Sequence, residues 1–198
     1  MTTNIIVIAH HARFSLANKL ANKLDAQIFL DEGDHGANWN HHNAIGYLNS
    51  ECSGGIVIED DAIPVPDFIF HANKWIERFP GKIISFYLGT GRPHQYQMTV
   101  RNKIDRALES GSDYITLPNL IHGVCYYVPS LLTKKILDNW DPKLPADFAV
   151  GRAYADDVIY PIYSLVQHSD IDSVEKHPDG QIRTERRQAI LLYGLSEK

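Results

Sequence analysis

Three consecutive acidic residues, Glu59, Asp60 and Asp61, are the side chains of this sequence best suited to chemistry. They follow directly on the apolar run 56–58, which predicts a buried strand. Adjacent carboxylates repel one another, and a divalent cation or a hydroxyl-rich ligand would offset that repulsion. The alternative interpretation is a solvated loop in which Asp67 caps the next helix.

The segments around these acids alternate between strand and helix patterns. Such alternation is typical of an α/β fold, in which helices cover a mostly parallel sheet and ligands bind at the carboxyl ends of the strands. The predicted strands are residues 5–9, 26–30, 55–58, 83–88, 114–117, 124–128 and 163–167. The predicted helices are residues 16–24, 39–48, 68–79, 100–108, a helix after a capping Ser130, a short one within 142–155, and 156–162.

Length and composition limit the classes of protein. The chain has 198 residues, of which 44% are hydrophobic, enough for one core and too few for two ordinary domains. A net charge of −5 gives no general attraction to nucleic acid, and we interpret the basic cluster of Arg183, Arg186 and Arg187 as a solvated helix face. Cys52 and Cys125 have no metal-binding spacing and are expected to be buried.

Several familiar sites and segments are not indicated. Residues 89–91 follow a predicted strand but lack the third glycine of a dinucleotide-binding loop, and there is no phosphate-binding loop of the Walker type. The N-terminal apolar run 5–9 is too short for a signal peptide or a membrane span. We therefore expect a cytoplasmic protein.

Short motifs, in the same order along the chain, resemble a known family of glycosyltransferases. Residues 56–61 look like the acidic motif that serves the Asp-x-Asp role in the lipopolysaccharide-type glycosyltransferase family (family 25). Residues 40–44 are similar to the segment of that family beside the donor nucleotide. Residues 123–130 and the helix after them look like the strand and helix beside its acceptor site.

Two later motifs extend the resemblance to roughly residues 4–174. Residues 144–147 and 155–158 are similar to the region that supplies the catalytic acid in inverting enzymes, and residues 160–169, with Ser173, resemble the closing segment of the family. The loop 89–112 has no counterpart. The resemblance implies a single GT-A-like, Rossmann-like domain over residues 1–198, with a nucleotide-sugar-binding half at about 1–100, an acceptor and catalytic half at about 101–175, and a tail at 176–198.

A glycosyltransferase of this kind needs a divalent cation, because negative charge grows on the diphosphate leaving group. Oxygen ligands suit Mg²⁺ or Mn²⁺, and an imidazole favours Mn²⁺. Because neighbouring side chains of a strand point to opposite faces, we assign Asp61 to the metal and Asp60 to the ribose of the donor or to an indirect contact. Glu59 and His168 are further candidate ligands, although His168 is equally well read as a partly buried histidine bonded to backbone.

The donor is expected to be a UDP-sugar bound by the loops after the first two strands. Its candidate contacts are His10, His11, Arg13, Asp31, Asn43 and Asp60. Arg13 could equally be a surface residue.

An inverting transfer also needs a carboxylate that takes the proton of the acceptor hydroxyl. Asp157 is the first choice, with Asp147 and Asp156 as rivals, and the alternative is that residues 156–157 cap a short helix. The acceptor site is expected at Arg92, His122 and Gly123. The acceptor is a glycan or, as in small bacteriophage members of such families, a hydroxymethylated DNA base.

The sequence therefore predicts a metal-dependent, inverting glycosyltransferase. Clustered acids at a strand end also serve metal-dependent nucleotidyltransferases and phosphodiesterases, although no Gly-rich loop with a paired Lys lies near the first strand. A third possibility is a catalytically inactive module that binds nucleotide sugars. The sequence defines neither the sugar nor the oligomeric state.

Overall fold

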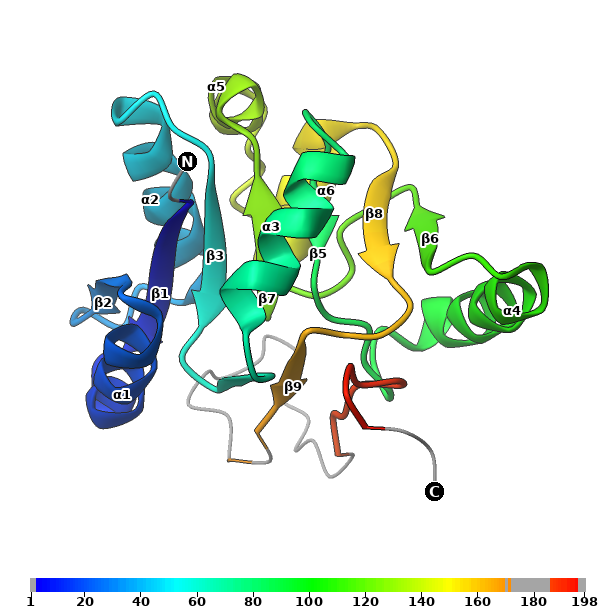
Figure 1. Ribbon diagram of the computed structural model, residues 1–198. Helices are drawn as coiled ribbons and strands as arrows, with labels where there is room; N and C mark the ends of the chain where they lie inside the picture. The colour runs from blue at the N-terminus through cyan, green and yellow to red at the C-terminus, as the bar shows by residue number, and fades with distance from the viewer. Residues whose placement is uncertain (1–2, 170, 172–185, 196–198) are drawn as a thin grey trace.

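A seven-stranded sheet runs through the centre of the protein in the computed structural model, which describes residues 3–169, 171 and 186–195 (Figure 1). The strand order is β2-β1-β3-β7-β5-β8-β6. The strands are β1 (Asn4–His10), β2 (Gln27–Asp31), β3 (Gly55–Glu59), β5 (Ile84–Ser85), β6 (Tyr114–Leu117), β7 (Cys125–Val128) and β8 (Val158–Pro161). The pairings of β7 with β3 and β5, and of β6 with β8, are antiparallel, so β6 and β7 run against the other five strands.

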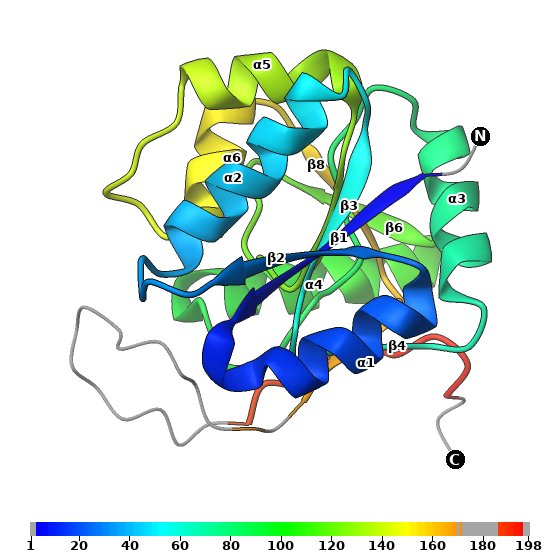
Figure 2. The same cartoon turned by 90° about the vertical axis from the view of Figure 1, so that its left-hand side faces the viewer.

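Helices cover both faces of this sheet, as Figure 2 shows from the side of β2. The helices are α1 (Phe14–Leu24), α2 (Ala37–Ser50), α3 (Phe68–Arg78), α4 (His94–Ser110), α5 (Ser130–Asp138) and α6 (Ala146–Tyr154), with a short 3-10 helix at His11–Arg13. One core lies between the sheet and α1 and α3, and the other between the sheet and α2, α4, α5 and α6. The predicted α/β class, with most strands pointing one way, is confirmed.

The first strand explains why both faces are covered. Ile5, Val7 and Ala9 belong to the core under α1 and α3, whereas Ile6 and Ile8 belong to the opposite core. Successive side chains of a strand alternate between faces, so a continuous apolar run requires a layer of helices on each side. Full burial of such a side chain contributes about 1.5–3 kcal/mol.

The carboxyl ends of β1, β2, β3, β5 and β8 meet at one edge of the sheet, the lower edge in Figure 1. A separate antiparallel pair, β4 (Ala62–Pro64) and β9 (Val166–His168), crosses this edge with Ala62 opposite His168. The Ser169 N–H also donates to the Asp61 carbonyl (2.8 Å). This pairing brings His168 beside the acidic residues that follow β3.

The segment 186–195 lies against the same edge. An isolated bridge pairs Gly89 with Ala189, and another pairs Ser164 with Leu192. Arg183 and Ser173, named above in sequence patterns, lie outside the described residues. No helix in the part of the chain that the structure describes is long and apolar enough to cross a bilayer.

Several predicted elements are wrong in type or extent. Residues 156–162 form no helix, because Val158, Ile159 and Tyr160 pair as β8, a role that suits β-branched and aromatic side chains. The last strand is Val166–His168 rather than 163–167, and regular pairing in 83–88 is restricted to β5.

Two capping predictions and one cysteine also differ from expectation. Pro129 occupies the cap position of α5, with Ser130 already helical, and Asp67 precedes α3 in a left-handed conformation without a side-chain capping bond. Cys125 is buried as expected, whereas Cys52 is exposed just beyond the end of α2.

Candidate metal centre and its surroundings

Glu59, Asp61 and His168 form a compact cluster at the carboxyl edge of the sheet. Each offers one ligand atom, and these atoms lie within 4.8 Å of one another. Glu59 ends β3, Asp61 lies in the turn between β3 and β4, and His168 ends β9. The side chains of Asp61 and His168 are only 5% and 3% exposed, so water does little to screen them. A cluster of this composition suits a divalent cation.

The hydrogen bond on the far side of the His168 ring decides what the ring offers to this cluster. His168 Nδ1 lies 2.5 Å from the Ser169 carbonyl, which can only accept, so Nδ1 carries the proton. In the neutral ring the lone pair of Nε2 then faces Oδ2 of Asp61 at 3.5 Å. Metal-bound histidines are commonly held in this way, with the other ring nitrogen donating to a carbonyl.

Buried polar atoms without partners point to the same conclusion. Within the described residues, His168 Nε2 and Asp61 Oδ1 are buried and have no hydrogen-bond partner. A buried polar atom left unpaired costs about 1–3 kcal/mol, and a carboxylate oxygen cannot pair with a ring-nitrogen lone pair, because both can only accept. A cation between them would pair both, so these residues fit a metal ion.

The cluster also carries an excess of negative charge, which again favours a cation. Burial, and then the charge of Glu59, raise the pKa of Asp61. Burial also works to raise the pKa of Glu59, but His41, and after it Arg187, outweigh burial and hold that pKa below its ordinary value. Glu59 is therefore kept ionised, and its charge disfavours ionisation of Asp61. A cation would relieve this repulsion between the two carboxylates.

Arg13 joins Asp60 and Asp61 into one buried ion-pair network. Its Nη1 lies 3.0 Å from Oδ1 of Asp60 and 2.9 Å from Oδ2 of Asp61, and its side chain is 11% exposed. The reading of Arg13 as a surface residue is therefore wrong. Burial raises the pKa of Asp60 to about 6 although Arg13 lowers it, and the backbone N–H of His10 also donates to Asp60 (3.3 Å).

The prediction that Asp60 and Asp61 point to opposite faces is also wrong. Both reach the same guanidinium, because the two residues form a turn after β3 rather than extended strand, where alternation would hold. They still differ in surroundings. Asp61 faces Glu59 and His168, whereas Asp60 faces Arg13 and the end of β1.

His41 and Gly123 support Glu59 from behind. His41 is fully buried, with Nε2 3.5 Å from Oε1 of Glu59 and Nδ1 2.9 Å from the hydroxyl of Tyr126. A Cβ atom at position 123 would lie 2.9 Å from Oε1 of Glu59 and 3.1 Å from Cε1 of His41. Only glycine leaves room for both side chains. Sequence reasoning placed His41 in a donor-side motif without giving it a role.

His122 and Tyr87 border the cluster on the side of β5. Burial, with a further contribution from Arg187, lowers the pKa of His122 to about 3, and its Nε2 accepts the Gly89 N–H (3.1 Å). His122 is therefore a neutral residue that holds the loop after β5. The Tyr87 hydroxyl is buried without a partner among the described residues, and burial raises its pKa. Sequence reasoning missed Tyr87, and its position at the end of an apolar strand was the available signal.

Asp147 approaches the cluster from the first turn of α6. The loop before it is tied to the start of α2, since Asn38 donates to the Leu144 carbonyl (2.7 Å) and accepts from Trp140 (3.0 Å). Burial, and then the charge of Glu59, raise the pKa of Asp147 to about 6, although Phe148 donates to it. Asp147 therefore shares an electrostatic environment with Glu59.

Asp156 and Asp157 lie at the opposite edge of the sheet. They precede β8, which is parallel to β5, so they stand at its amino end, where Asp156 pairs with Lys82 (2.6 Å) just before β5. Asp156 also accepts the N–H of the exposed Asp157 (2.7 Å). The structure does not bring these two predicted catalytic residues to the acidic cluster, because strand direction puts the whole sheet between them.

Asp31, expected to contact the donor, is occupied by its own loop. Its buried carboxylate accepts the N–H groups of Gly33 (3.1 Å), His35 (3.1 Å) and Gly36 (2.8 Å). Burial works to raise the pKa of Asp31, but the His35 side chain (Nδ1 3.0 Å from Oδ1) and then these backbone bonds outweigh burial and lower the pKa to about 2. Asp31 therefore shapes the turn before α2. Asn43 is half-buried on α2. It follows His41 by two residues, a rotation of about 200° around the helix axis, so the two side chains lie on different faces of the helix.

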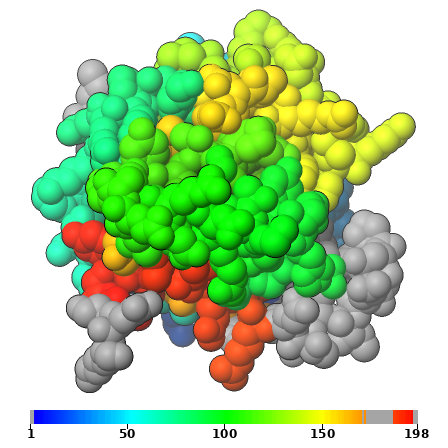
Figure 3. Space-filling view, turned by 90° about the vertical axis from the view of Figure 1, so that its right-hand side faces the viewer, coloured from blue at the N-terminus to red at the C-terminus, as the bar shows by residue number. Residues whose placement is uncertain are grey.

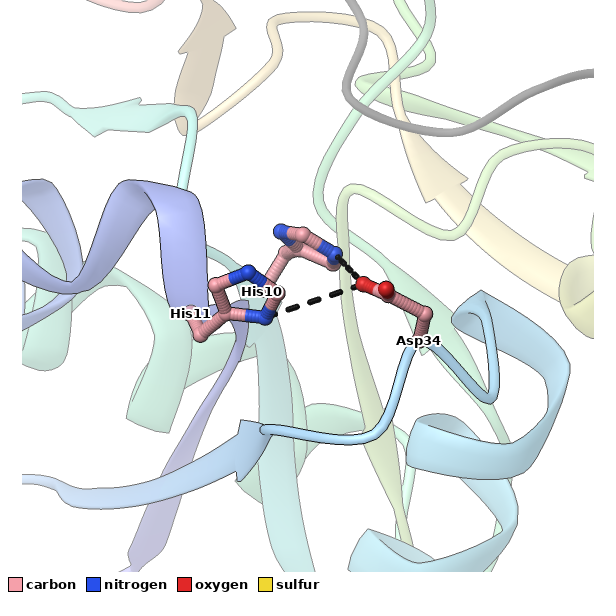
Figure 4. Close-up of side chains that lie close together, drawn as sticks. All are labelled: His10, His11 and Asp34. Carbon is pink, nitrogen blue, oxygen red and sulfur yellow. Dashed lines mark hydrogen bonds and ion pairs between the residues drawn. The ribbon is translucent and has the colours of Figure 1, made fainter.

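His10 and His11 form a second cluster with Asp34, which Figure 4 shows between the ends of β1 and β2. His10 Nε2 lies 2.6 Å and His11 Nδ1 3.7 Å from the same oxygen of Asp34. The Ala12 N–H donates to His10 Nδ1 (3.2 Å), so the His10 proton is on Nε2 and faces Asp34. This cluster lies on the donor side of Arg13 and Asp60.

Arg92 is half-buried in the loop that follows β5 at the carboxyl edge. Its carbonyl lies 3.5 Å from the side-chain amide of Gln97, near the start of α4. Arg92, His122 and Gly123 therefore all lie at the edge that carries the acids. His122 and Gly123 border Glu59 itself.

Comparison with known proteins gives a fold and no family. No protein-family model matches the sequence, and no curated protein matches it. The chain is similar to the crystal structure of A197 from STIV, with a TM-score of 0.56 at 10% identity over 99% of this chain and 98% of that chain. A likeness at this identity shows a shared fold.

A second likeness is weaker. A putative glucose-1-phosphate thymidylyltransferase from Bacillus anthracis in complex with a sucrose has a TM-score of 0.45 at 8% identity, over 80% of this chain and 85% of that chain. This score is too low to establish a shared fold. The chemistry of the site therefore has to be argued from its own residues.

Proposed function

We propose that this protein is a metal-dependent glycosyltransferase that uses a nucleotide-sugar donor. The observation that carries the proposal is the cluster of Glu59, Asp61 and His168, in which His168 Nε2 and Asp61 Oδ1 are buried without a hydrogen-bond partner among the described residues. The cluster lies where open α/β sheets bind their ligands. Mn²⁺ is the expected cation, with Mg²⁺ as the alternative, because an imidazole accompanies two carboxylates.

The cation and the donor have complementary charges. When bound, a divalent cation would stabilise the negative charge that develops on a diphosphate as the bond to the sugar breaks. The protein's own task is to hold and orient the donor. Arg13 and Asp60, with His10 beside them, border the cluster on the side of β1 and are proposed to contact the nucleoside, for which uridine is the first choice.

Asp147 is the proposed catalytic base in place of Asp157. It is the predicted catalytic acid that shares the environment of Glu59, and its pKa of about 6 suits proton transfer near neutral pH. A carboxylate that takes the proton of the acceptor hydroxyl supports an inverting transfer. The acceptor would then enter beside Gly123 and the Arg92 loop.

A panel of nucleotide sugars tests the function. The protein is incubated with UDP- and GDP-sugars and Mn²⁺, and in a parallel reaction with nucleoside triphosphates, sugar phosphates and Mn²⁺, and both nucleoside diphosphate and pyrophosphate are measured. Slow release of nucleoside diphosphate, absent in Asp61→Asn and retained in the surface variant Arg152→Ala, would support a glycosyltransferase. Pyrophosphate formed from a nucleoside triphosphate and a sugar phosphate would identify a nucleotidyltransferase instead, and metal-dependent binding without either product would identify a binding module.

The class of acceptor is tested separately. Binding of DNA with hydroxymethylated bases should weaken steeply as salt rises, because neutralised phosphates release counterions. Affinity for a glycan should change little over the same range. The net charge of −5 makes a glycan the first acceptor to try.

A further inference from the structure

The described C-terminal segment, residues 186–195, is pinned across the carboxyl edge next to the candidate metal centre. Thr90 Oγ1 donates to the Arg186 carbonyl (3.3 Å), and the Thr90 N–H donates to the Gln188 carbonyl (2.8 Å). The Ala189 N–H donates to the side-chain carbonyl of Gln167 (2.7 Å). These bonds hold the backbone on both sides of Arg187.

The partners of this segment belong to the site. Gln167 directly precedes His168, and Gly89, which pairs with Ala189, donates its N–H to His122. Figure 3 shows residues 186–195 as orange-red and red spheres below the green of α4. Segments far apart in the sequence thus converge on one side of the metal centre, and Arg187 lies at the point where they meet.

The Arg187 guanidinium differs from that of Arg13. Arg13 is paired with Asp60 and Asp61, whereas Arg187 is half-buried and makes no hydrogen bond or ion pair within the described residues. Its charge nevertheless works to lower the pKa of both Glu59 and Asp61, although burial and Glu59 keep the pKa of Asp61 raised. With its backbone held beside Thr90 and Gln167, Arg187 therefore lies near the cluster, and its five N–H donors have no partner among the described residues.

The formal charges around Arg187 indicate which kind of ligand its N–H donors could bind. A divalent cation would cancel the charges of Glu59 and Asp61, and Arg13 would cancel that of Asp60. The positive charge of Arg187 then remains beside the cation, on the side away from Arg13. An anion with several oxygens suits this pair, because a guanidinium binds two phosphate oxygens at once.

We propose that Arg187 binds the phosphate oxygens of the nucleoside diphosphate, so that the C-terminal segment closes the donor site opposite Arg13. This inference rests on the proposed function and adds a phosphate-binding residue to it. The competing explanation is that Arg187 serves only as a counter-ion to Glu59 and Asp61. The two explanations differ in the effect that they predict on UDP binding.

The experiment measures two affinities by calorimetry for the full chain and its variants. Mn²⁺ alone should bind Arg187→Ala as tightly as the wild type, or a few times more tightly, because a nearby positive charge has been removed. UDP in saturating Mn²⁺ should bind Arg187→Ala about 10- to 100-fold more weakly, the value of charge-assisted hydrogen bonds to phosphate. Arg187→Lys should lose less, and uridine, which lacks phosphate, should bind all variants equally.

Arg186→Ala is the matched control, since it removes the same charge from an exposed side chain of the same segment. It should leave both affinities within about twofold. Unchanged UDP binding by Arg187→Ala, with tighter Mn²⁺ binding, would overturn the inference and leave Arg187 as a counter-ion. A wild type that binds neither Mn²⁺ nor UDP would instead overturn the proposed function. Thermal melting of each variant checks that the segment still folds.

Discussion

Two clusters of histidine and carboxylate side chains lie at the carboxyl edge of the sheet. The imidazole rings of one cluster direct N–H groups at the carboxylate, and the ring of the other directs a lone pair at it. In the cluster of His10, His11 and Asp34, both ring nitrogens that face Asp34 carry protons. His10 accepts the Ala12 N–H on its other nitrogen, and His11 Nδ1 itself donates to the Asp31 carbonyl (3.3 Å). The Asp34 carboxylate is thus already supplied with donors.

The cluster of Glu59, Asp61 and His168 has the reverse arrangement. His168 donates through Nδ1 to the Ser169 carbonyl, so its lone pair faces a carboxylate that is 5% exposed, whereas Asp34 is 73% exposed. The cluster around Asp34 forms its own hydrogen bonds in an exposed setting, whereas the cluster around Asp61 leaves a ring lone pair facing a buried carboxylate, an arrangement that suits a cation. A nearby backbone group selects the tautomer of a histidine, and the tautomer decides whether a lone pair is available to bind a metal.

The largest expected effect is on metal binding. Asp61→Asn should weaken Mn²⁺ binding by about 100-fold or more, because loss of a ligand exceeds the 10- to 100-fold cost of losing a supporting contact. Asp34→Asn should change it by less than about threefold. Titration followed by electron paramagnetic resonance of free Mn²⁺ measures both. Equal losses in the two variants would mean that the clusters do not differ as argued.

The next effect is on turnover, and it tests which acid serves the buried cluster. Asp147→Asn should lower kcat by about 10²–10⁴, the usual contribution of a general base, with Mn²⁺ and UDP affinity nearly intact. Asp157→Asn, at the opposite edge, should retain near-normal kcat. Initial rates with a saturating donor compare them. Activity that depends on Asp157 and not on Asp147 would contradict the assignment.

The same residue should make stability depend on pH. The pKa of Asp147 is raised from 3.8 to about 6, so the folded state binds this proton more tightly than the unfolded state. The free energy of unfolding therefore falls as pH rises from about 4 to about 6, and Asp147→Asn avoids that loss. At pH 7 the variant should be more stable than the wild type by roughly 1–3 kcal/mol, with no gain at pH 3.5. Urea unfolding at both pH values checks the difference, and an equal gain at both would refute the linkage.

The smallest effect concerns the space behind Glu59. Gly123→Ala puts a methyl group 2.9 Å from Oε1 of Glu59, so this carboxylate or His41 must shift. We expect Mn²⁺ affinity to fall about 10-fold, as for other supporting contacts of a metal site. Gly46→Ala is the control, since a Cβ atom there meets nothing within 4 Å. Unaltered Mn²⁺ binding by Gly123→Ala would show that Glu59 is not a ligand held in place by this packing.

The sequence by itself determined the features that depend on near neighbours. The apolar run before Glu59 predicted the buried strand β3, and the alternation of patterns predicted the α/β class, because strand and helix periodicities are local. The sequence pattern gave a wrong prediction at residues 156–162, where a strand was interpreted as a helix. That error also removed the means of knowing which edge of the sheet Asp157 occupies.

Tertiary structure alone decided which distant residues share the site. The pairing of β4 with β9 brings His168 beside Asp61, 107 positions earlier, and the bonds of Thr90 and Gln167 bring Arg187 to the same place. It also put Asp147 on the side of the acids and Asp157 on the other. Side-chain proximity across the chain follows from strand order, strand direction and backbone hydrogen bonds, and none of these is encoded in the spacing of the residues that they bring together.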